Sequence, residues 1–422
     1  MESYPYKNYK IVDADQLNAD LTSVADAIRI KGKTTASLDF PDGFVGAIDN
    51  IKTGDDAQVA KKDVNFYDYD GTLLNSYTVA EAQALTELPE LPEREGLICQ
   101  GWNWTLEDIK AHNRAVDVGA TYTTDDGTTR IYIHLEEGRT SPMLGVCPNG
   151  TVTVDWGDGT TPDTLTGTST STVKWTPSHE YAEPGDYVIR LTVDGTMGID
   201  GNLTTNQYSY ILRHSSGADT RNIAYQNSLK KIEIGNNVAS FGAQAFGYCY
   251  SLESIVIPNS VKSFGKNAFN TCYSLKAVVI PNGVTSIIDD VFNGCLSLKA
   301  VVIPNSVKSF SYQAFNNIKT LASIVIPNSV TSFGNSSFAN CTSLTSIVIP
   351  NSVKSFGSSV FNKCYGIAYF DFTNCTAVPT LSSSDSFSNI ASDCKIYVPA
   401  ALHDEWIAAT NWATYASKIV AV

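Results

Sequence analysis

One unit of 23 residues recurs six times between residues 229 and 366, and it constrains the fold more than any other feature of the chain. The copies begin at Leu229, Leu252, Leu275, Leu298, Leu321 and Leu344. A fixed period in the twenties is the signature of a stacked solenoid, because each unit buries its apolar face only against the next copy. Such a stack presents an extended surface and no enclosed pocket. The repeat therefore favours recognition over catalysis.

The slots that stay constant between copies indicate how the stack is held together. In the second copy, LESIVIPNSVKSF, a short strand is expected to point Leu252, Ile255 and Ile257 inward. An aromatic slot follows, and its side chains should stack as a buried ladder of Phe246, Phe269, Phe292, Phe315, Phe338 and Phe361. After residue 367 the pattern fades, and the stretch 395–415 is expected to cap the stack.

Cysteines occupy one slot in five of the six copies, and Ile318 fills it in the remaining copy. An isoleucine substitute marks the slot as apolar and buried. We expect an unpaired ladder of thiols in the core, which favours folding in a reducing cytoplasm. Disulfide bonds between neighbouring copies are the alternative. The slot contains Cys249, Cys272, Cys295, Cys341 and Cys364.

The consensus of the copies, L-x-x-I-V-I-P-N-S-V-x-S-F-x-x-x-A-F-x-x-C, resembles the BspA-like leucine-rich repeat family. The resemblance covers about half of the chain. It implies a leucine-rich repeat solenoid over residues 197–422, with the repeats at 229–366 and a terminal cap after them. It also implies that side chains outside the core meet a target.

The slot after the first inward isoleucine holds valine in five successive copies, with Glu233 before the row and Asp371 after it. We expect this row to face away from the core as an apolar ridge large enough to be a contact surface. The alternative is ordinary β-propensity on a solvated strand face, with charges at the ends that block edge pairing. The valine ridge consists of Val256, Val279, Val302, Val325 and Val348.

Two further slots vary freely between copies. Variable side chains on a constant frame suit a surface that recognises a receptor, and tyrosine is a favoured anchor in interfaces. Drift on an unused convex face would give the same pattern. Besides the valine ridge, the candidate binding residues are Lys266, Asp289, Tyr312, Asn335, Tyr250, Tyr273 and Tyr365.

Residues 1–54 are expected to form a helical segment for attachment or oligomerisation. Asp13 suits the cap of a helix whose apolar residues fall on one stripe. Helices of this length are marginal alone, so they need a partner. A trimeric coiled coil, a larger assembly or the next domain would supply one. The stripe consists of Leu17, Leu21, Val24 and Ile28.

Residues 55–124 are expected to form a small α+β domain with one motif that suggests chemistry. The sequence FYDYDGTL resembles the DxDGT signature of haloacid-dehalogenase-type phosphatases, which implies Asp68 as nucleophile and Asp70 as acid. That chemistry requires a parallel doubly wound sheet and further magnesium-binding residues, for which the segment is too short. Asp-Gly between two apolar strands is also the ordinary hairpin signal, and we favour the hairpin.

Residues 125–196 contain short alternating strands, and two of their motifs resemble the PKD-domain pattern. WGDGT at 156–160 is followed by HEY at 179–181 and PGDY at 184–187. The resemblance implies an immunoglobulin-like β-sandwich that acts as a spacer. Asp155 and Asp158 suit either a calcium ion or turn capping, and we favour capping.

Composition argues against several classes of function. A net charge of -14 and a pI near 4.8 argue against nucleic-acid binding. No apolar run is long enough for membrane insertion, and the start of the sequence lacks the pattern of a secretory signal peptide. The five histidines lie near no GxSxG, HExxH or P-loop motif, so we expect no enzyme and no cofactor, and no CxxC pair indicates a metal.

These features predict a multidomain, mainly β, non-enzymatic binding protein: N-terminal helices, a small α+β unit, a PKD-like β-sandwich and a C-terminal solenoid. This order resembles minor tail or tail-fibre proteins of bacteriophages. The resemblance implies a virion protein, assembled in the host cytoplasm, that binds a bacterial surface receptor of protein or glycan. Its N-terminal helices would contact other tail proteins or form a homotrimer. The alternative is a BspA-like bacterial cell-surface adhesin, and a weaker one is a phosphatase.

Overall fold

The computed structural model describes residues 61–167, 177–199, 210–214 and 225–422. The described part is mainly β, as predicted. None of its helices is long and apolar enough to cross a membrane. The predicted N-terminal helical segment lies outside the described residues, so its oligomerisation stripe stays a prediction: Leu17, Leu21, Val24 and Ile28.

Residues 61–124 form a four-stranded sheet in the order β2-β1-β4-β3 with two short helices. The elements are β1 (Val64–Tyr67), β2 (Leu73–Tyr77), α3 (Val79–Ala84), β3 (Leu97–Trp102), α4 (Leu106–His112) and β4 (Val116–Thr124). Thr78 begins α3 with a capping box, and Thr105 caps α4. Every residue of β4 is buried, so both faces of this sheet are covered. We call residues 61–124 the α+β unit.

The following strands share a sheet with the first repeat. Strand β5 (Thr129–Leu135) lies between β9 (Gly185–Ile199) and β11 (Leu229–Glu233), and β9 pairs in parallel with β12 (Val238–Phe241). The first copy of a solenoid would otherwise expose unpaired strand edges, and β5 and β9 cover them. This segment therefore caps the N-terminal end of the solenoid, whereas the sequence predicts a separate spacer.

Three further strand pairings complete this cap. Strand β7 (Val146–Asp155) pairs with β9 and with β8 (Asp163–Gly167), both antiparallel. Strand β6 (Pro142–Leu144) pairs with β10 (Leu212–His214) as a separate two-stranded sheet. The apolar residues of these strands belong to the same continuous core as the repeats.

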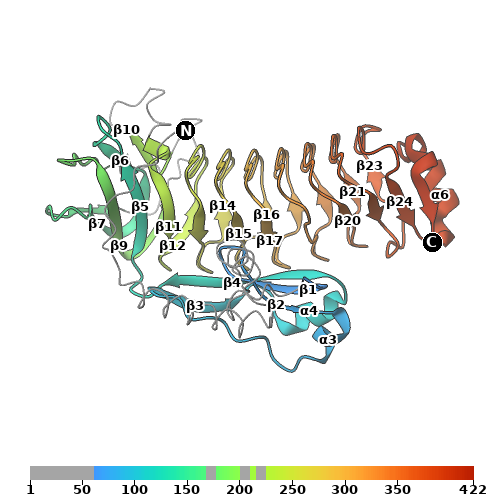
Figure 1. The fold of residues 1–422 in the computed structure, drawn as a ribbon, viewed down its shortest axis with the longest axis horizontal. Coiled ribbons are helices and arrows are strands. Elements are labelled where there is room, and N and C mark those ends of the chain that lie inside the picture. The colour runs from blue at the N-terminus through green and yellow to red at the C-terminus, as the bar shows by residue number, and fades with distance from the viewer. Residues whose placement is uncertain (1–60, 168–176, 200–209, 215–224) are drawn as a thin grey trace, which may run out of the picture. The chain divides into compact units, whose positions relative to one another are not determined.

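The repeats stack as rows of short strands, seen side by side in Figure 1. Where neighbouring strands pair, each residue lies opposite its equivalent in the next copy, as Ser309 does with Ser332. The first row is interrupted at the fifth copy, where residues 321–327 form no strand. The first row contains β13 (Ser254–Val256), β15 (Ala277–Val279), β17 (Ala300–Val302), β20 (Ser346–Val348), β22 (Tyr369–Asp371), β24 (Lys395–Val398) and β25 (Ile419–Ala421). The second row contains β14 (Ser263–Phe264), β16 (Ser286–Ile287), β18 (Ser309–Phe310), β19 (Ser332–Phe333), β21 (Ser355–Phe356) and β23 (Thr380–Leu381).

The predicted phenylalanine ladder is confirmed. All six rings, from Phe246 to Phe361, are fully buried. Neighbouring rings stack with their centroids 5.0–5.7 Å apart. A second set of phenylalanines from the second strand row packs edge-on against this ladder, as Phe310 does on Phe315 at 5.3 Å. Each copy therefore covers the apolar side chains of the next copy with its own phenylalanine rings.

The cysteine slot is a ladder of free, buried thiols, as predicted. The Sγ atom of Cys272 lies 3.1 Å from the carbonyl oxygen of Phe246, and this contact recurs along the stack. Burial raises the pKa of the Cys295 and Cys364 thiols to about 12. The thiols therefore stay protonated, donate to the carbonyl groups and are poor nucleophiles.

Each copy also turns through two left-handed backbone positions, which the sequence did not reveal. The first is held by Gln244, Asn267, Asp290, Gln313, Ser336 and Ser359, and the second by Tyr248, Thr271, Gly294, Asn317, Asn340 and Lys363. At these positions the N–H groups point to carbonyl oxygens of the next copy, as from Thr271 to Asn293 at 2.7 Å. These inter-repeat hydrogen bonds offset the strain of the conformation.

We expect Thr271→Asn to raise the free energy of unfolding by about 1 kcal/mol, because a β-branched residue is strained at positive φ and asparagine is tolerated there. Thr271 has a φ of 58°, and asparagine already holds the same slot at 317. Asn317→Thr is the mirror variant and should lower stability by a similar amount. Urea unfolding followed by fluorescence measures both, and a Thr271→Asn protein less stable than its parent would contradict the strain account.

The C-terminal end of the stack is closed by three short helices, which lie in and just beyond the stretch 395–415 that the sequence predicts as a cap. They are η1 (Ala400–Leu402), α6 (His403–Ala408) and η2 (Trp412–Lys418). Trp406 and Trp412 are fully buried, and the indole nitrogen of Trp412 donates to the carbonyl oxygen of Pro379 at 2.7 Å. These two large side chains cover the apolar end that the last repeat would otherwise expose.

Candidate interaction surfaces

The α+β unit covers most of the valine ridge. Val256, Val279 and Val302 are 0%, 5% and 1% exposed, respectively. Val256 belongs to the core of the α+β unit, and the other two pack with Tyr67 and Leu73. The remaining members are half-buried: Val325 and Val348. The prediction of a solvent-exposed ridge is therefore wrong for the three buried valines, because their contact is made within the chain.

The α+β unit makes polar contacts with five successive copies, and β4 lies against β13, β15 and β17. The following hydrogen bonds are one example from each of the first five copies, in order. They are Thr123 Oγ1 to Ile234 O (3.3 Å), Asn259 Nδ2 to Thr121 Oγ1 (3.1 Å), Asn103 Nδ2 to Ile280 O (3.0 Å), Trp104 Nε1 to Ile303 O (3.0 Å) and Arg114 Nη2 to Ile326 O (3.5 Å). Each of these five copies thus supplies at least one hydrogen-bonding group to the unit, close to the end of its first apolar run.

Small residues permit the close approach of the two surfaces. A Cβ atom added at Gly119 would lie 2.4 Å from Cγ1 of Val279, and one at Gly71 would lie 2.7 Å from Cβ of Ala277. The outward slot two residues before the ridge holds alanine at 277 and 300 but serine in the flanking copies. The replacement of serine by alanine in these two copies is the sequence signal for a covered surface. Its meaning becomes clear only when the structure shows which strand lies across from it.

Two ionisable groups of the α+β unit are shielded from water. Burial raises the pKa of the Asp117 carboxyl, which accepts a hydrogen bond from Asn65 Nδ2 at 3.0 Å. Burial and the Arg114 guanidinium lower the pKa of His112 to about 4. The His112 ring packs on Trp104, with centroids 5.2 Å apart. Both groups therefore lie in the interior of the unit, away from solvent.

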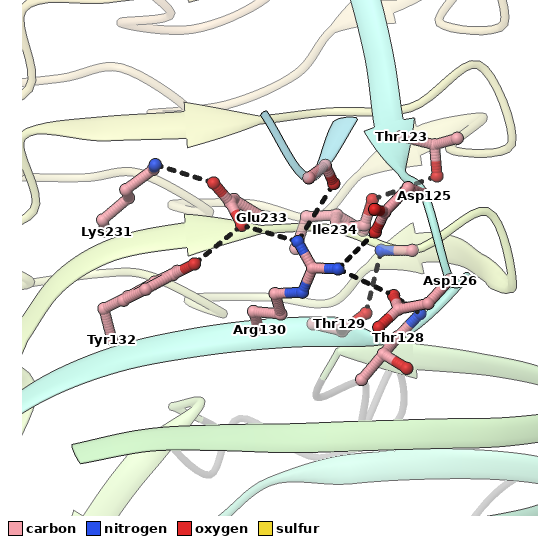
Figure 2. A network of polar contacts seen from close by, with 12 residues as sticks. Thr123, Asp125, Asp126, Thr128, Thr129, Arg130, Tyr132, Lys231, Glu233 and Ile234 are labelled. Atoms are coloured by element: carbon pink, nitrogen blue, oxygen red, sulfur yellow. Dashed lines mark hydrogen bonds and ion pairs between the residues drawn. The ribbon is translucent and has the colours of Figure 1, made fainter. Parts of the chain in front are cut away.

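Arg130 joins the α+β unit, the N-terminal cap and the first repeat (Figure 2). Its guanidinium donates to the carbonyl oxygen of Gly96 at 3.0 Å and pairs with Asp126 at 3.0 Å and with Asp125. The same side chain reaches Glu233 of β11 at 3.4 Å. A planar guanidinium with five donors suits such a junction.

Glu233, the acid predicted to begin the ridge, is a buried member of this junction. It is 4% exposed and pairs with Lys231 Nζ at 2.7 Å. The Tyr132 hydroxyl donates to it at 2.8 Å, as Figure 2 shows. A buried carboxylate needs such partners. The first copy therefore carries glutamate in place of valine because Arg130, Lys231 and Tyr132 surround this slot.

The DxDGT-like segment forms the hairpin between β1 and β2. Asp68 N donates to Thr72 O at 2.8 Å, and Gly71 has a φ of 88°. Asp68 is buried, and Arg94 Nε donates to its carboxylate at 2.7 Å. The hairpin prediction is confirmed. The carboxylate that the phosphatase resemblance assigns as nucleophile is engaged in an ion pair.

The PKD-like motifs come together around Trp156. Its ring stacks on His179 at 5.0 Å, and its carbonyl oxygen accepts a hydrogen bond from the Tyr181 hydroxyl at 2.8 Å. Asp155 accepts from Gly157 N, and Asp158 accepts from Thr160 N and contacts His179 at 2.7 Å. Hydrogen bonds from Thr160 and His179 lower the pKa of Asp158 to about 2 despite partial desolvation. Both aspartates therefore cap turns. Within the described residues no cluster of three or more His, Cys, Asp or Glu suited to a metal is found.

The two variable slots lie on one side of the solenoid, which we call the turn edge: the stretch between each second-row strand and the next leucine. Here Lys266 pairs with Asp289 at 2.8 Å, and Tyr250 stacks on Tyr273 at 4.6 Å. The aromatic residues Tyr273, Tyr312 and Tyr365 are 40%, 47% and 56% exposed, respectively. Asn335 is also exposed. The turn edge thus keeps the candidate residues that the α+β unit leaves free.

Comparison with known proteins bears on the repeats alone. The family model described as the BspA type leucine rich repeat region matches in six copies, over residues 220–322 and 262–391. The match thus spans the repeats and leaves the first half of the chain uncovered. A search of curated proteins finds no match.

Several solved structures are similar to part of this chain. A leucine rich cell surface protein from Faecalibacterium prausnitzii is 24% identical with a TM-score of 0.29, over 39% of this chain and 58% of that chain. The T. pallidum leucine rich repeat protein is 24% identical with a TM-score of 0.26, over 42% and 86%. The pneumococcal vaccine antigen PcpA is 15% identical with a TM-score of 0.30, over 44% and 64%. The chain thus spans less than two thirds of the first and the third.

Proposed function

We propose that the chain is a non-enzymatic recognition protein of the bacterial surface-adhesin kind, which binds a surface macromolecule through the turn edge. The observation that carries this proposal is the exposure of Tyr273, Tyr312 and Tyr365, which come from the second, fourth and sixth copies and from the two variable slots. Tyrosine provides a large contact area at low conformational-entropy cost. The match of the repeats to the BspA-type family supports the proposal.

Replacing the three exposed tyrosines of the turn edge by alanine is expected to weaken attachment at least about tenfold, since such anchors dominate interfaces. The assay is flow cytometry of labelled protein on bacterial cells and on epithelial cells. The matched control replaces three exposed lysines beside the second strand row, Lys262, Lys308 and Lys354, and should bind as the parent does. Equal binding by both variants, or no binding of the parent to either cell type, contradicts the proposal.

Location separates the adhesin from the phage-tail interpretation, which rests on the domain order in the sequence. An adhesin should be labelled by a membrane-impermeant biotin reagent on intact producing cells. A tail protein should instead be found in purified virus-like particles and stay unlabelled on cells. The phosphatase alternative has no support in the geometry of Asp68, whose carboxylate is held by Arg94.

A further inference from the structure

The first strand row changes character where the α+β unit ends. Under the unit, the outward slots of the second to the fifth copies hold only serine, alanine and valine. Beyond it, β22 presents Tyr369 and Asp371, and β24 presents Lys395 and Tyr397. The residue between the members of each pair is fully buried, so these four side chains point away from the core. A surface of large polar and aromatic groups therefore lies on the same strand row, beyond the part that the α+β unit covers.

The two tyrosines of this surface form an aromatic platform. The ring centroids of Tyr369 and Tyr397 lie 5.7 Å apart at an interplanar angle of 52°, and Tyr369 is 38% exposed. Parallel pairing sets Tyr369 beside Lys395 and Asp371 beside Tyr397. Strands in register, rather than a loop, thus hold the rings and the charges, so a ligand would meet a preorganised site.

A cationic side chain flanks the platform although the chain carries a net charge of -14. Lys395 is exposed and adjacent to Tyr369. Arg114, at the border of the α+β unit, is engaged elsewhere, since its guanidinium donates to Ile326 O and to Asn328 Oδ1. The site therefore offers an aromatic surface, a free ammonium group and a carboxylate close together.

We propose that Tyr369, Tyr397 and Lys395 bind an acidic saccharide. The apolar C–H face of a carboxylated pyranose stacks on the tyrosine rings, its carboxylate pairs with Lys395 Nζ, and Asp371 accepts hydrogen bonds from its hydroxyls. The surface continues the interface used by the α+β unit. It offers six outward side chains between β20 and β24, far fewer than the about 20–30 residues per side of a stable protein interface. A small ligand therefore fits it better than a protein does.

Isothermal titration of the full chain with tri-galacturonic acid, sialyllactose and neutral lactose tests this site. We expect at least one acidic saccharide to bind and lactose to bind at least about tenfold more weakly, since the ion pair is lost. Tyr369→Ala and Tyr397→Ala should each weaken binding about tenfold. Lys395→Ala should remove the preference for the acidic sugars, and Lys395→Arg should keep it. The two acidic probes distinguish a uronic from a sialic ligand.

Lys308→Ala, which removes an exposed lysine beside the second strand row, is the matched control and should bind as the parent does. Circular dichroism confirms that each variant is folded. Three results overturn the proposal: no saccharide binds, lactose binds as well as the acidic sugars, or Lys308→Ala weakens binding as much as Tyr369→Ala. The site does not depend on the turn edge, so its failure leaves the proposed adhesin function standing, and the failure of cell attachment leaves this site standing.

Discussion

Phe292→Ala is expected to lower the free energy of unfolding by about 3–5 kcal/mol, the range for removing a fully buried phenylalanine. Phe292 is 0% exposed and stacks between Phe269 at 5.4 Å and Phe315 at 5.6 Å. The cavity would lie in the middle of the ladder, where neither neighbour can shift without losing its own stack. Urea unfolding followed by circular dichroism measures the change.

Tyr312→Ala is the matched control for this prediction, because it removes an exposed aromatic side chain one copy further on. Its effect should stay within about 0.5 kcal/mol of the parent. If both variants lost the same stability, the ladder would not be the main support of the stack.

Gly119→Val is expected to lower the free energy of unfolding by about 1–3 kcal/mol, because overpacking forces the two surfaces apart. Its Cβ alone would lie 2.4 Å and 2.7 Å from the two Cγ atoms of Val279. Loss of contact should also speed hydrogen exchange of the β4 amides, which lie against β13, β15 and β17.

A double-mutant cycle controls for the intrinsic cost of valine at position 119. Val279→Ala removes the two Cγ atoms that would clash, so the double variant should recover part of the loss, with a coupling of about 1–2 kcal/mol. Additive effects would mean that Gly119 and Val279 do not touch, and the docking of the α+β unit on the valine ridge would have to be abandoned.

The interior of the solenoid was predictable because its signal is local and repeated. The slots of Phe269, Cys272 and Leu275 recur every 23 residues. A slot that holds an apolar residue in every copy must face the same core each time. The hairpin at Asp70 and Gly71 was predictable for a similar reason, since a turn is decided by adjacent residues. The left-handed Thr271 was not predictable, because only the inter-repeat hydrogen bonds offset its strain.

The exposed or buried state of the ridge was not predictable from its own residues. A valine on an outward strand slot has the same local sequence whether water or a second domain covers it. The contact of Val279 with Gly119 joins residues 160 positions apart, and neither side carries a motif. The buried Glu233 is a similar case, since its partner Arg130 lies 103 positions away.

The sequence by itself determined the stack, its ladders and the apolar slot of its cysteines, because these follow from periodicity and from residue size. Only the tertiary structure decided which outward face is free. The α+β unit occupies the ridge from Val256 to Val302, and this leaves the turn edge and the surface around Tyr369 and Tyr397 to a partner. The physical reason is that burial depends on what lies across from a side chain, and that neighbour comes from a distant part of the chain.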